Sequence, residues 1–166
     1  MAKEKKYILS SDIVNRKLSR LALEIIEGNM GEKELVFVGI ESTGVILAKR
    51  LQQLVEAQSV LKVELLTMSM NKQKPEEIVL SKELNFDNKV IVIIDDVTNT
   101  GKTLLYAMKP FLRFHPRAIQ TLVLVERSYT QFPIRANYKG YSLATTFQEH
   151  ITVEVEGDNI TGVYLS

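Results

Sequence analysis

Two adjacent carboxylates, Asp95 and Asp96, stand where an apolar run of the chain stops. The run before them, residues 90–94, contains only valine and isoleucine, which is typical of a strand buried on both faces of a parallel sheet. Ligands of open α/β sheets bind at the carboxyl ends of such strands. Carboxylates placed there accept hydrogen bonds from sugar hydroxyls or bind Mg²⁺ through oxygen. The pair therefore predicts a site for hydroxyl groups or for a divalent cation.

The segment after the two acids is suited to bind an anion. Its residues are Val97, Thr98, Asn99, Thr100, Gly101, Lys102 and Thr103, and an apolar helix pattern follows them. Three threonine hydroxyls, a glycine that allows close backbone approach, and the free amides of a helix start all favour phosphate. A phosphate next to a carboxylate pair predicts a phosphorylated sugar, with its phosphate in residues 98–103 and its diol on the acids.

Three other interpretations compete for this segment. A P-loop needs a glycine five residues before Gly101, and Asp96 stands there, so we reject it. A flavodoxin-like phospho-acceptor domain would use the acids to bind Mg²⁺, but it leaves residues 98–103 unexplained. An ordinary strand-to-helix turn is the third interpretation, and it does not account for acids, turn and buried strand in succession.

Residues 90–103 closely resemble the signature of the type I phosphoribosyltransferases, which use 5-phosphoribosyl-1-pyrophosphate (PRPP) and Mg²⁺. The resemblance implies that Asp95 and Asp96 hold the ribose hydroxyls, directly or through Mg²⁺, and that residues 98–103 hold the 5-phosphate. Mg²⁺ is the expected cofactor, and PRPP with a nucleobase or nucleotide are the expected ligands. We assign no general base, because Asn99 stands where some purine-using relatives place a catalytic carboxylate.

A second buried strand, residues 35–40, precedes another polar turn and helix pattern. The resemblance implies that this turn, Glu41, Ser42, Thr43 and Gly44, grips the pyrophosphate of PRPP, a task for which the family usually adds a basic side chain. Here the turn has no lysine or arginine. At close range the Glu41 carboxylate would repel a pyrophosphate, with an unfavourable interaction energy on the order of 1 kcal/mol. The alternative is a plain helix-capping turn.

A polar, proline-containing segment follows a third strand at residues 61–68 and precedes a short return strand at 78–80. The resemblance implies that this segment is a flexible loop that closes over PRPP, and we expect a small hood over the site here. Lys72 and Lys74 are its basic groups available to pyrophosphate. A pair of solvated lysines is the alternative.

The strand pattern at residues 118–125 leads into a run, residues 125–140, that resembles the PyrR family. PyrR proteins are pyrimidine-operon attenuators that also have uracil phosphoribosyltransferase activity. The resemblance runs almost from end to end of the chain. It implies that four residues near the end of this strand lie beside the nucleobase: Val125, Glu126, Arg127 and Ile134.

The chain departs from the PyrR pattern at three places. The basic residues of the first loop are replaced by residues 41–44, a Tyr-Arg pair of the flexible loop is Ser69-Met70, and the Gly-His-Arg of the base site is residues 128–130. Loss of cations that would stabilise charge on the leaving pyrophosphate predicts slow catalysis or a different substrate.

Three further elements complete the expected secondary structure. Candidate caps at residues 10–12 precede an apolar face of helical spacing that should end near Gly28. The helix from Gly101 should run to about Phe114, with a kink at Pro110. Residues 151–165 are expected to form a hairpin that adds an antiparallel edge to the sheet.

The 166 residues suit one domain, expected over residues 1–166, and 45% hydrophobic and 25% charged content are ordinary for a globular protein. No apolar run approaches a membrane span, no secretory segment is evident, and no cysteine is present, so we expect a cytoplasmic protein without membrane partner, disulfide or thiolate metal site. The expected fold is α/β, a twisted and mainly parallel sheet with helices on both faces and a small hood.

We expect a Mg²⁺-dependent phosphoribosyltransferase that joins PRPP to a nucleobase, with uracil as the expected base. The alternatives are a nucleotide-sensing regulator that binds RNA and a binding-only relative with weakened catalysis. The net charge of +1 gives no support to a strongly basic nucleic-acid binder. The resemblance also implies a homo-oligomer, a dimer or a tetramer.

Overall fold

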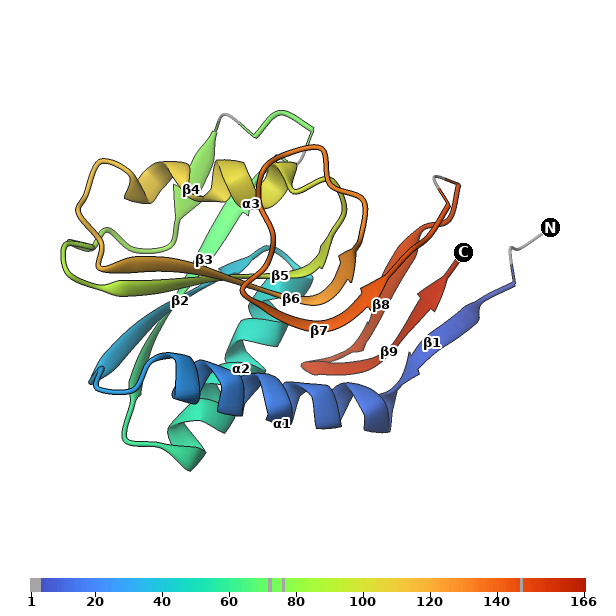
Figure 1. The fold of residues 1–166 in the computed structure, drawn as a ribbon, viewed down its shortest axis with the longest axis horizontal. Helices are drawn as coiled ribbons and strands as arrows, with labels where there is room; N and C mark the ends of the chain where they lie inside the picture. The colour runs from blue at the N-terminus through green and yellow to red at the C-terminus, as the bar shows by residue number, and fades with distance from the viewer. Residues whose placement is uncertain (1–3, 72, 76, 147) are drawn as a thin grey trace.

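The computed structural model describes residues 4–71, 73–75, 77–146 and 148–166. Within this part of the chain, the central sheet has six strands in the order β4-β3-β2-β5-β6-β7 (Figure 1). Strand β4 is antiparallel to β3, and the other neighbours are parallel. The strands are β2 (Glu34–Ile40), β3 (Lys62–Met70), β4 (Ile78–Leu80), β5 (Val90–Thr98), β6 (Ala118–Arg127) and β7 (Tyr138–Leu143).

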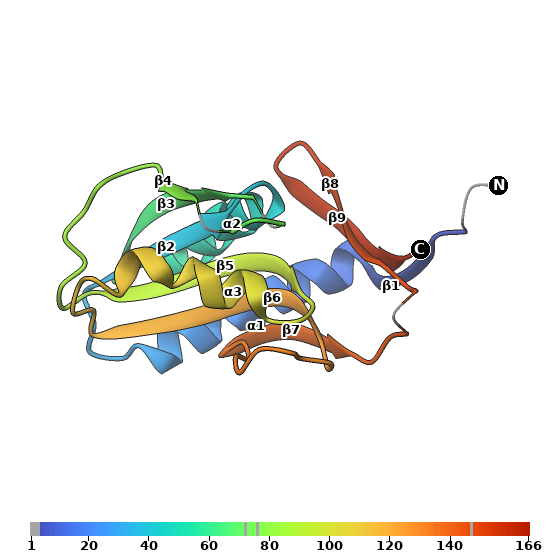
Figure 2. The ribbon, with the colours of Figure 1, turned by 90° about the horizontal axis from the view of Figure 1, so that it is seen from above.

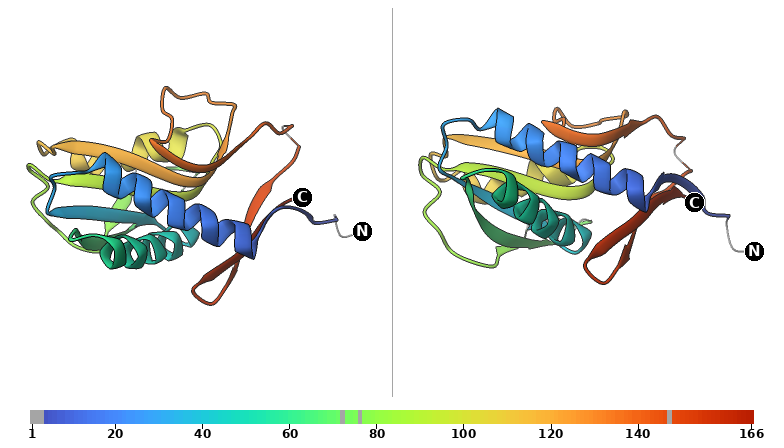
Figure 3. Two further views of the ribbon diagram at one scale, coloured as in Figure 1. Left: turned by 60° about the horizontal axis from the view of Figure 1, so that its bottom comes forward. Right: turned by 90° about the horizontal axis from the view of Figure 1, so that it is seen from below.

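Helices cover both faces of this sheet. The α-helices α1 (Ser11–Gly28) and α2 (Thr43–Gln58) lie side by side on one face, as Figure 3 shows, and α3 (Lys102–Ala107) lies on the other. Strand β5 divides its side chains between the two cores, since Val92 and Ile94 pack with α1 and α2 while Ile91 and Ile93 pack on the α3 side. This alternation is the period-two geometry of a strand buried on both faces. The expected α/β fold is confirmed.

Helix α1 forms where the apolar spacing predicted it. Ser10 caps its first turn, since the Ser10 side chain accepts a hydrogen bond from the Ile13 amide at 3.4 Å. The buried face contains Val14, Leu18, Leu21, Ala22 and Ile25. Burial of this stripe stabilises the helix far more than its intrinsic propensity does.

A second, three-stranded antiparallel sheet lies at one end of the molecule and has the order β1-β9-β8. It consists of β1 (Lys6–Ser10), β8 (Ile151–Glu156) and β9 (Asn159–Leu165). The hairpin of β8 and β9 was predicted correctly, but its placement as an edge of the main sheet was wrong, because β9 pairs with β1 instead. The short return strand expected at residues 78–80 is confirmed as β4, an edge strand that pairs antiparallel with β3. A hood formed by residues 69–80 stays a prediction. The small sheet outside the main one is built from both ends of the chain.

The helix after Gly101 is shorter than expected. It ends at Ala107, and a 3₁₀ helix, η1 (Lys109–Phe111), follows it. Pro110 lies inside η1, and proline has no N–H to continue an α-helical ladder. The predicted continuation of one α-helix to Phe114 was therefore wrong. The kink expected at Pro110 corresponds to the place where the 3₁₀ helix replaces the α-helix.

Candidate functional site

Three loops meet at one edge of the main sheet because β2, β5 and β6 are parallel neighbours. Gly39 of β2 is in register with Ile94 of β5, and Thr98 of β5 is in register with Glu126 of β6. The loops that follow these strands therefore emerge side by side, as the view from above in Figure 2 shows for the strands. The topology brings the first loop, the acid pair and the end of β6 to one site.

The acid pair is held rigidly at the end of β5. Asp95 is only 1% exposed and Asp96 is half-buried. The Asp96 amide donates to Asp95 Oδ1 at 2.9 Å, and the Val97 amide donates to Asp96 Oδ1 at 2.8 Å. Amide donors stabilise carboxylates that have lost water. Both acids are thus fixed in position at the strand end.

The turn from Thr98 to Thr103 is braced from a neighbouring loop. Gly101 adopts a φ of +88°, a conformation that glycine takes without strain, and it precedes α3 directly. The Thr100 carbonyl accepts two amides from the loop between β6 and β7, those of Gln131 at 2.9 Å and Phe132 at 3.0 Å. The Thr100 hydroxyl accepts the Lys102 amide at 3.3 Å. These contacts fix the backbone of the turn.

The first loop lies directly against the acid pair. Gly44 is buried and packs on the backbone of Ile94 and Asp95. Glu41 is exposed, and its peptide bond with Ser42 is cis. Helix α2 begins at Thr43, but the Ser42 side chain makes no capping hydrogen bond, so Ser42 does not serve as the side-chain cap of the alternative interpretation.

The expected flexible loop is described only in part. Lys74 is exposed in the turn between β3 and β4, and its amide donates to the Asn71 carbonyl at 3.0 Å. Lys72 lies outside the described residues. A joint role of the two lysines stays a prediction.

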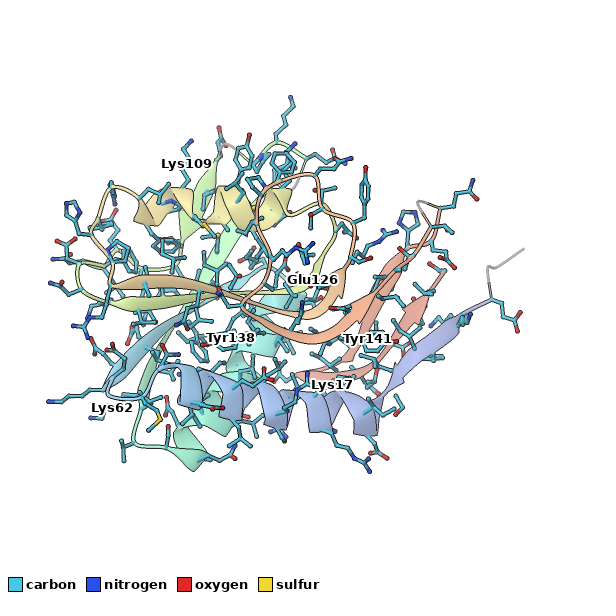
Figure 4. The ribbon with its side chains drawn as sticks, in the orientation of Figure 1. Lys17, Lys62, Lys109, Glu126, Tyr138 and Tyr141 are labelled. Carbon is cyan, nitrogen blue, oxygen red and sulfur yellow. The ribbon has the colours of Figure 1, made fainter. Side chains whose placement is uncertain are left out.

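The four residues expected beside the nucleobase occupy different places. Val125 belongs to the core on the α1 and α2 side of the sheet, and Ile134 packs against Gly101. Glu126 is buried, and its carboxylate accepts hydrogen bonds from the side chains of β7 and from the loop before it: Lys139 Nζ at 3.0 Å, Ser142 Oγ at 3.4 Å and the Ala136 amide at 3.3 Å. Figure 4 shows Glu126 at the end of β6 beneath this loop. Glu126 therefore ties β6 to β7 and to the loop.

Arg127 is the member of this group that lines a cavity of about 200 Å³. The cavity is bounded by Asn99, Thr100, Arg127, Tyr129, Gln131 and Thr145. Arg127 donates to Asn99 Oδ1 at 3.2 Å and to the Thr146 carbonyl at 2.6 Å. The cavity thus opens beside the turn expected to hold phosphate. Neither Gln131 nor Thr145 was singled out from the sequence, since no local pattern marks them.

The residues present fit a Mg²⁺ ion that is held mainly by its ligand. No group of three or more metal-ligating side chains occurs in the described ranges. Mg²⁺ commonly uses only one or two carboxylates and completes its shell with water and substrate phosphates. Asp95 and Asp96 offer the two oxygen ligands that this arrangement needs.

In the ranges that the structure describes, no helix is long and apolar enough to cross a bilayer.

Comparison with known sequences gives a consistent family. The phosphoribosyl transferase domain family matches residues 6–156. The chain is 36% identical over 171 residues to the "Bifunctional protein PyrR" of Pelotomaculum thermopropionicum, with 95% of this chain and 94% of the relative covered. It is also 36% identical over 160 residues to the protein of that name from Clostridium acetobutylicum, with 90% of each covered.

Solved structures share the fold at lower identity. A hypoxanthine-guanine phosphoribosyltransferase from Bacillus anthracis superposes with a TM-score of 0.77 at 19% identity and covers 96% of each chain. The hypoxanthine phosphoribosyltransferase of Trypanosoma cruzi in complex with IMP gives a TM-score of 0.81 at 14% identity, over 98% of this chain and 83% of that one. Together with the match over residues 6–156, these findings show that the chain belongs to the type I phosphoribosyltransferase family, in the branch of the PyrR proteins.

Proposed function

We propose that this protein is a Mg²⁺-dependent phosphoribosyltransferase that transfers ribose 5-phosphate from PRPP to uracil and releases UMP and pyrophosphate. One observation carries the proposal: the buried Asp95 and its neighbour Asp96 directly precede a braced turn of hydroxyls and amides at the carboxyl end of β5. Acids that accept from a diol and a turn that donates to a phosphate match the two ends of a ribose 5-phosphate.

Different residues bind the ribose and the 5-phosphate of PRPP. Asp95 and Asp96 orient the ribose, and residues 98–103 hold the 5-phosphate, so that C1 of the ribose faces the cavity beside Arg127. The C1–oxygen bond breaks with its electron pair leaving on pyrophosphate, while N1 of uracil bonds to C1 and gives up its proton to water. Mg²⁺, when bound, neutralises charge on the phosphates. The chain supplies positioning, and no general base is assigned.

Uracil as the base is supported by the PyrR relatives rather than by the solved structures. The structures named for hypoxanthine-guanine enzymes are under 20% identical and support the fold alone. The relatives named "Bifunctional protein PyrR" are 36% identical along most of the chain.

A second candidate is a relative that binds nucleotides and regulates through RNA, with little or no catalysis. The exposed Glu41 in the first loop, which has no lysine or arginine, favours it. Such a loop stabilises the pyrophosphate leaving group poorly. The word "bifunctional" in the names of the relatives is consistent with a second role.

Pyrophosphate release from PRPP, measured with uracil, cytosine, hypoxanthine and guanine, separates the two candidates. Turnover with uracil supports the enzyme. UMP binding without turnover for any base refutes it, and a salt-dependent shift of a pyrimidine-operon leader RNA then supports the regulator.

The site itself is tested by Asp95→Asn combined with Asp96→Asn. This variant should lose PRPP binding by calorimetry while its circular dichroism stays that of the parent. Asp158→Asn, in the exposed β8–β9 turn, is the matched control and should bind PRPP normally. Parent affinity in the double variant would refute the assignment of the acids.

A further inference from the structure

Arg127 fixes the orientation of the Asn99 side chain at the mouth of the cavity. Its guanidinium donates to Asn99 Oδ1 at 3.2 Å and to the Thr146 carbonyl at 2.6 Å. Arginine has five N–H donors and no acceptor, so the oxygen of the Asn99 amide must face it. The Asn99 NH₂ group is therefore the part of this side chain left for a ligand, and it can only donate.

The wall of the cavity has no charged acceptor, since no carboxylate is among the described residues that line it. Glu126, the acid next to Arg127 in β6, points to Lys139, Ser142 and the Ala136 amide instead. Gln131 is exposed and can present either end of its amide. The side chains of the wall that hydrogen bonds hold in place are thus Asn99 and Arg127. The Asn99 NH₂ and the Arg127 guanidinium can only donate, so they suit a carbonyl oxygen better than an amino group.

The size of the cavity sets a further limit. At about 200 Å³ it is smaller than the roughly 300 Å³ at which sites for drug-sized ligands begin, so it suits a single ring. It also adjoins the turn at Thr100, where the proposed function places the 5-phosphate. A base attached to that ribose would enter here.

We propose that Asn99, oriented by Arg127, is the residue that selects an oxo-pyrimidine over an amino-pyrimidine. The proposal rests on the proposed function, because it needs ribose phosphate in the adjoining turn. The Asn99 NH₂ donates a hydrogen bond to a ring carbonyl. Opposite an exocyclic amino group it places one donor against another, which makes no hydrogen bond. Uracil, with two carbonyls, satisfies the site, and cytosine leaves an amino group facing donors.

Calorimetry with UMP, CMP and ribose 5-phosphate tests the proposal without requiring turnover. UMP should bind about tenfold tighter than CMP, as expected for one hydrogen bond gained against one donor clash. Asn99→Asp keeps the contact with Arg127 but turns an acceptor towards the base, so the UMP:CMP affinity ratio should fall to about one or below. The ratio cancels any effect of the new charge on the shared phosphate.

A matched control keeps the result specific to the cavity. Asn159→Asp makes the same chemical change in the exposed β8–β9 hairpin and should leave the ratio unchanged.

Each outcome decides between the inference and the proposed function. Equal affinity of the parent for UMP and CMP, with ribose 5-phosphate still bound, overturns the selection by Asn99 and leaves the ribose phosphate site in place. A parent ratio that Asn99→Asp does not change also overturns it. Absence of ribose 5-phosphate and PRPP binding overturns the inference together with the proposed function.

Discussion

Gly44 and Asp95 lie against each other so closely that no side chain fits between them. A Cβ atom added to Gly44 would stand 3.2 Å from Asp95 Cα, 3.5 Å from Asp95 Oδ1 and 2.7 Å from the Ile94 carbonyl oxygen. The first loop is thus seated on the backbone of the acid pair. The position of Asp95 depends on a glycine 51 residues earlier in the chain.

Gly44→Ala should weaken PRPP binding through this contact. The added methyl group must displace the end of β5, because the atoms it meets are backbone, at a cost of about 1–3 kcal/mol in unfolding free energy. PRPP affinity, measured by calorimetry, should fall at least several-fold. Gly140→Ala is the control: its Cβ would meet the Leu124 carbonyl oxygen at 2.6 Å, a clash of similar size between β6 and β7. Equal losses of PRPP affinity in both variants would contradict a role of the Gly44–Asp95 contact.

Gly101→Ala should damage the phosphate turn by two separable effects. A φ of +88° costs an alanine about 1–2 kcal/mol, and the new Cβ would also lie 2.7 Å from Ile134 Cγ2. Gly31→Ala has the same backbone penalty, since φ is +90°, but its Cβ would meet no atom of the described residues within 4 Å.

Chemical denaturation of both glycine variants measures the two effects. The stability lost by Gly101→Ala beyond that of Gly31→Ala reports the contact with Ile134. Ribose 5-phosphate affinity should fall only in Gly101→Ala. If the Gly31 variant lost this affinity as well, general destabilisation would explain both results.

The central elements were predictable because their signals are local. The valine and isoleucine run at residues 90–94 indicated a strand buried on both faces, and the change of character at Asp95 marked its end. Strand β7 had no such signal, since Tyr138–Leu143 contains a glycine and no β-branched residue, and its pairing with β6 is what makes it a strand. The hairpin at residues 151–165 was recognised, but its partner β1 lies more than 140 residues away.

The same difference between local and long-range signals applies to the candidate site. The residues of one loop could be grouped from spacing alone, as Asp95, Asp96 and Thr98 to Thr103 were. Contacts between loops could not: Arg127 meets Thr146 only because β7 runs parallel beside β6, and Glu126 pairs with Lys139 for the same reason. The sequence predicted Glu126 beside the nucleobase. In the structure, its carboxylate accepts hydrogen bonds from β7 and so joins β6 to β7.

Acid should weaken recognition of the base through Glu149. The Glu149 carboxylate accepts the Thr146 amide at 3.0 Å and the Thr146 hydroxyl at 3.2 Å. The amide hydrogen bond is the main cause that holds the pKa of Glu149 below its ordinary value of 4.5. Because the folded pKa is the lower one, this stabilisation is complete above pH 4.5 and is lost as the pH falls below it.

The Thr146 carbonyl accepts Arg127, so loosening this turn should loosen the wall of the cavity. The affinity of UMP relative to ribose 5-phosphate should therefore decline as the pH falls below 4.5. Glu149→Gln should show the reduced ratio at neutral pH and little further change with acid. A ratio in this variant that still follows the parent's pH profile would assign the effect to another group.

Glu41→Lys should tighten PRPP binding by restoring a cation to the first loop. Glu41 is exposed, and its loop is seated on the acid pair through Gly44. The family resemblance places the pyrophosphate at this loop. Reversing one charge at about 4 Å in a water-like environment changes the interaction by about 2 kcal/mol, and screening reduces this to an expected gain of about tenfold at low salt.

Ribose 5-phosphate, which has no pyrophosphate, should bind Glu41→Lys and the parent equally. Glu27→Lys, at the exposed end of α1, makes the same change in net charge and should leave both affinities unchanged. If turnover with uracil rises along with PRPP affinity, the missing cation limits catalysis in the natural chain. An unchanged ratio of PRPP to ribose 5-phosphate affinity would place the pyrophosphate away from Glu41.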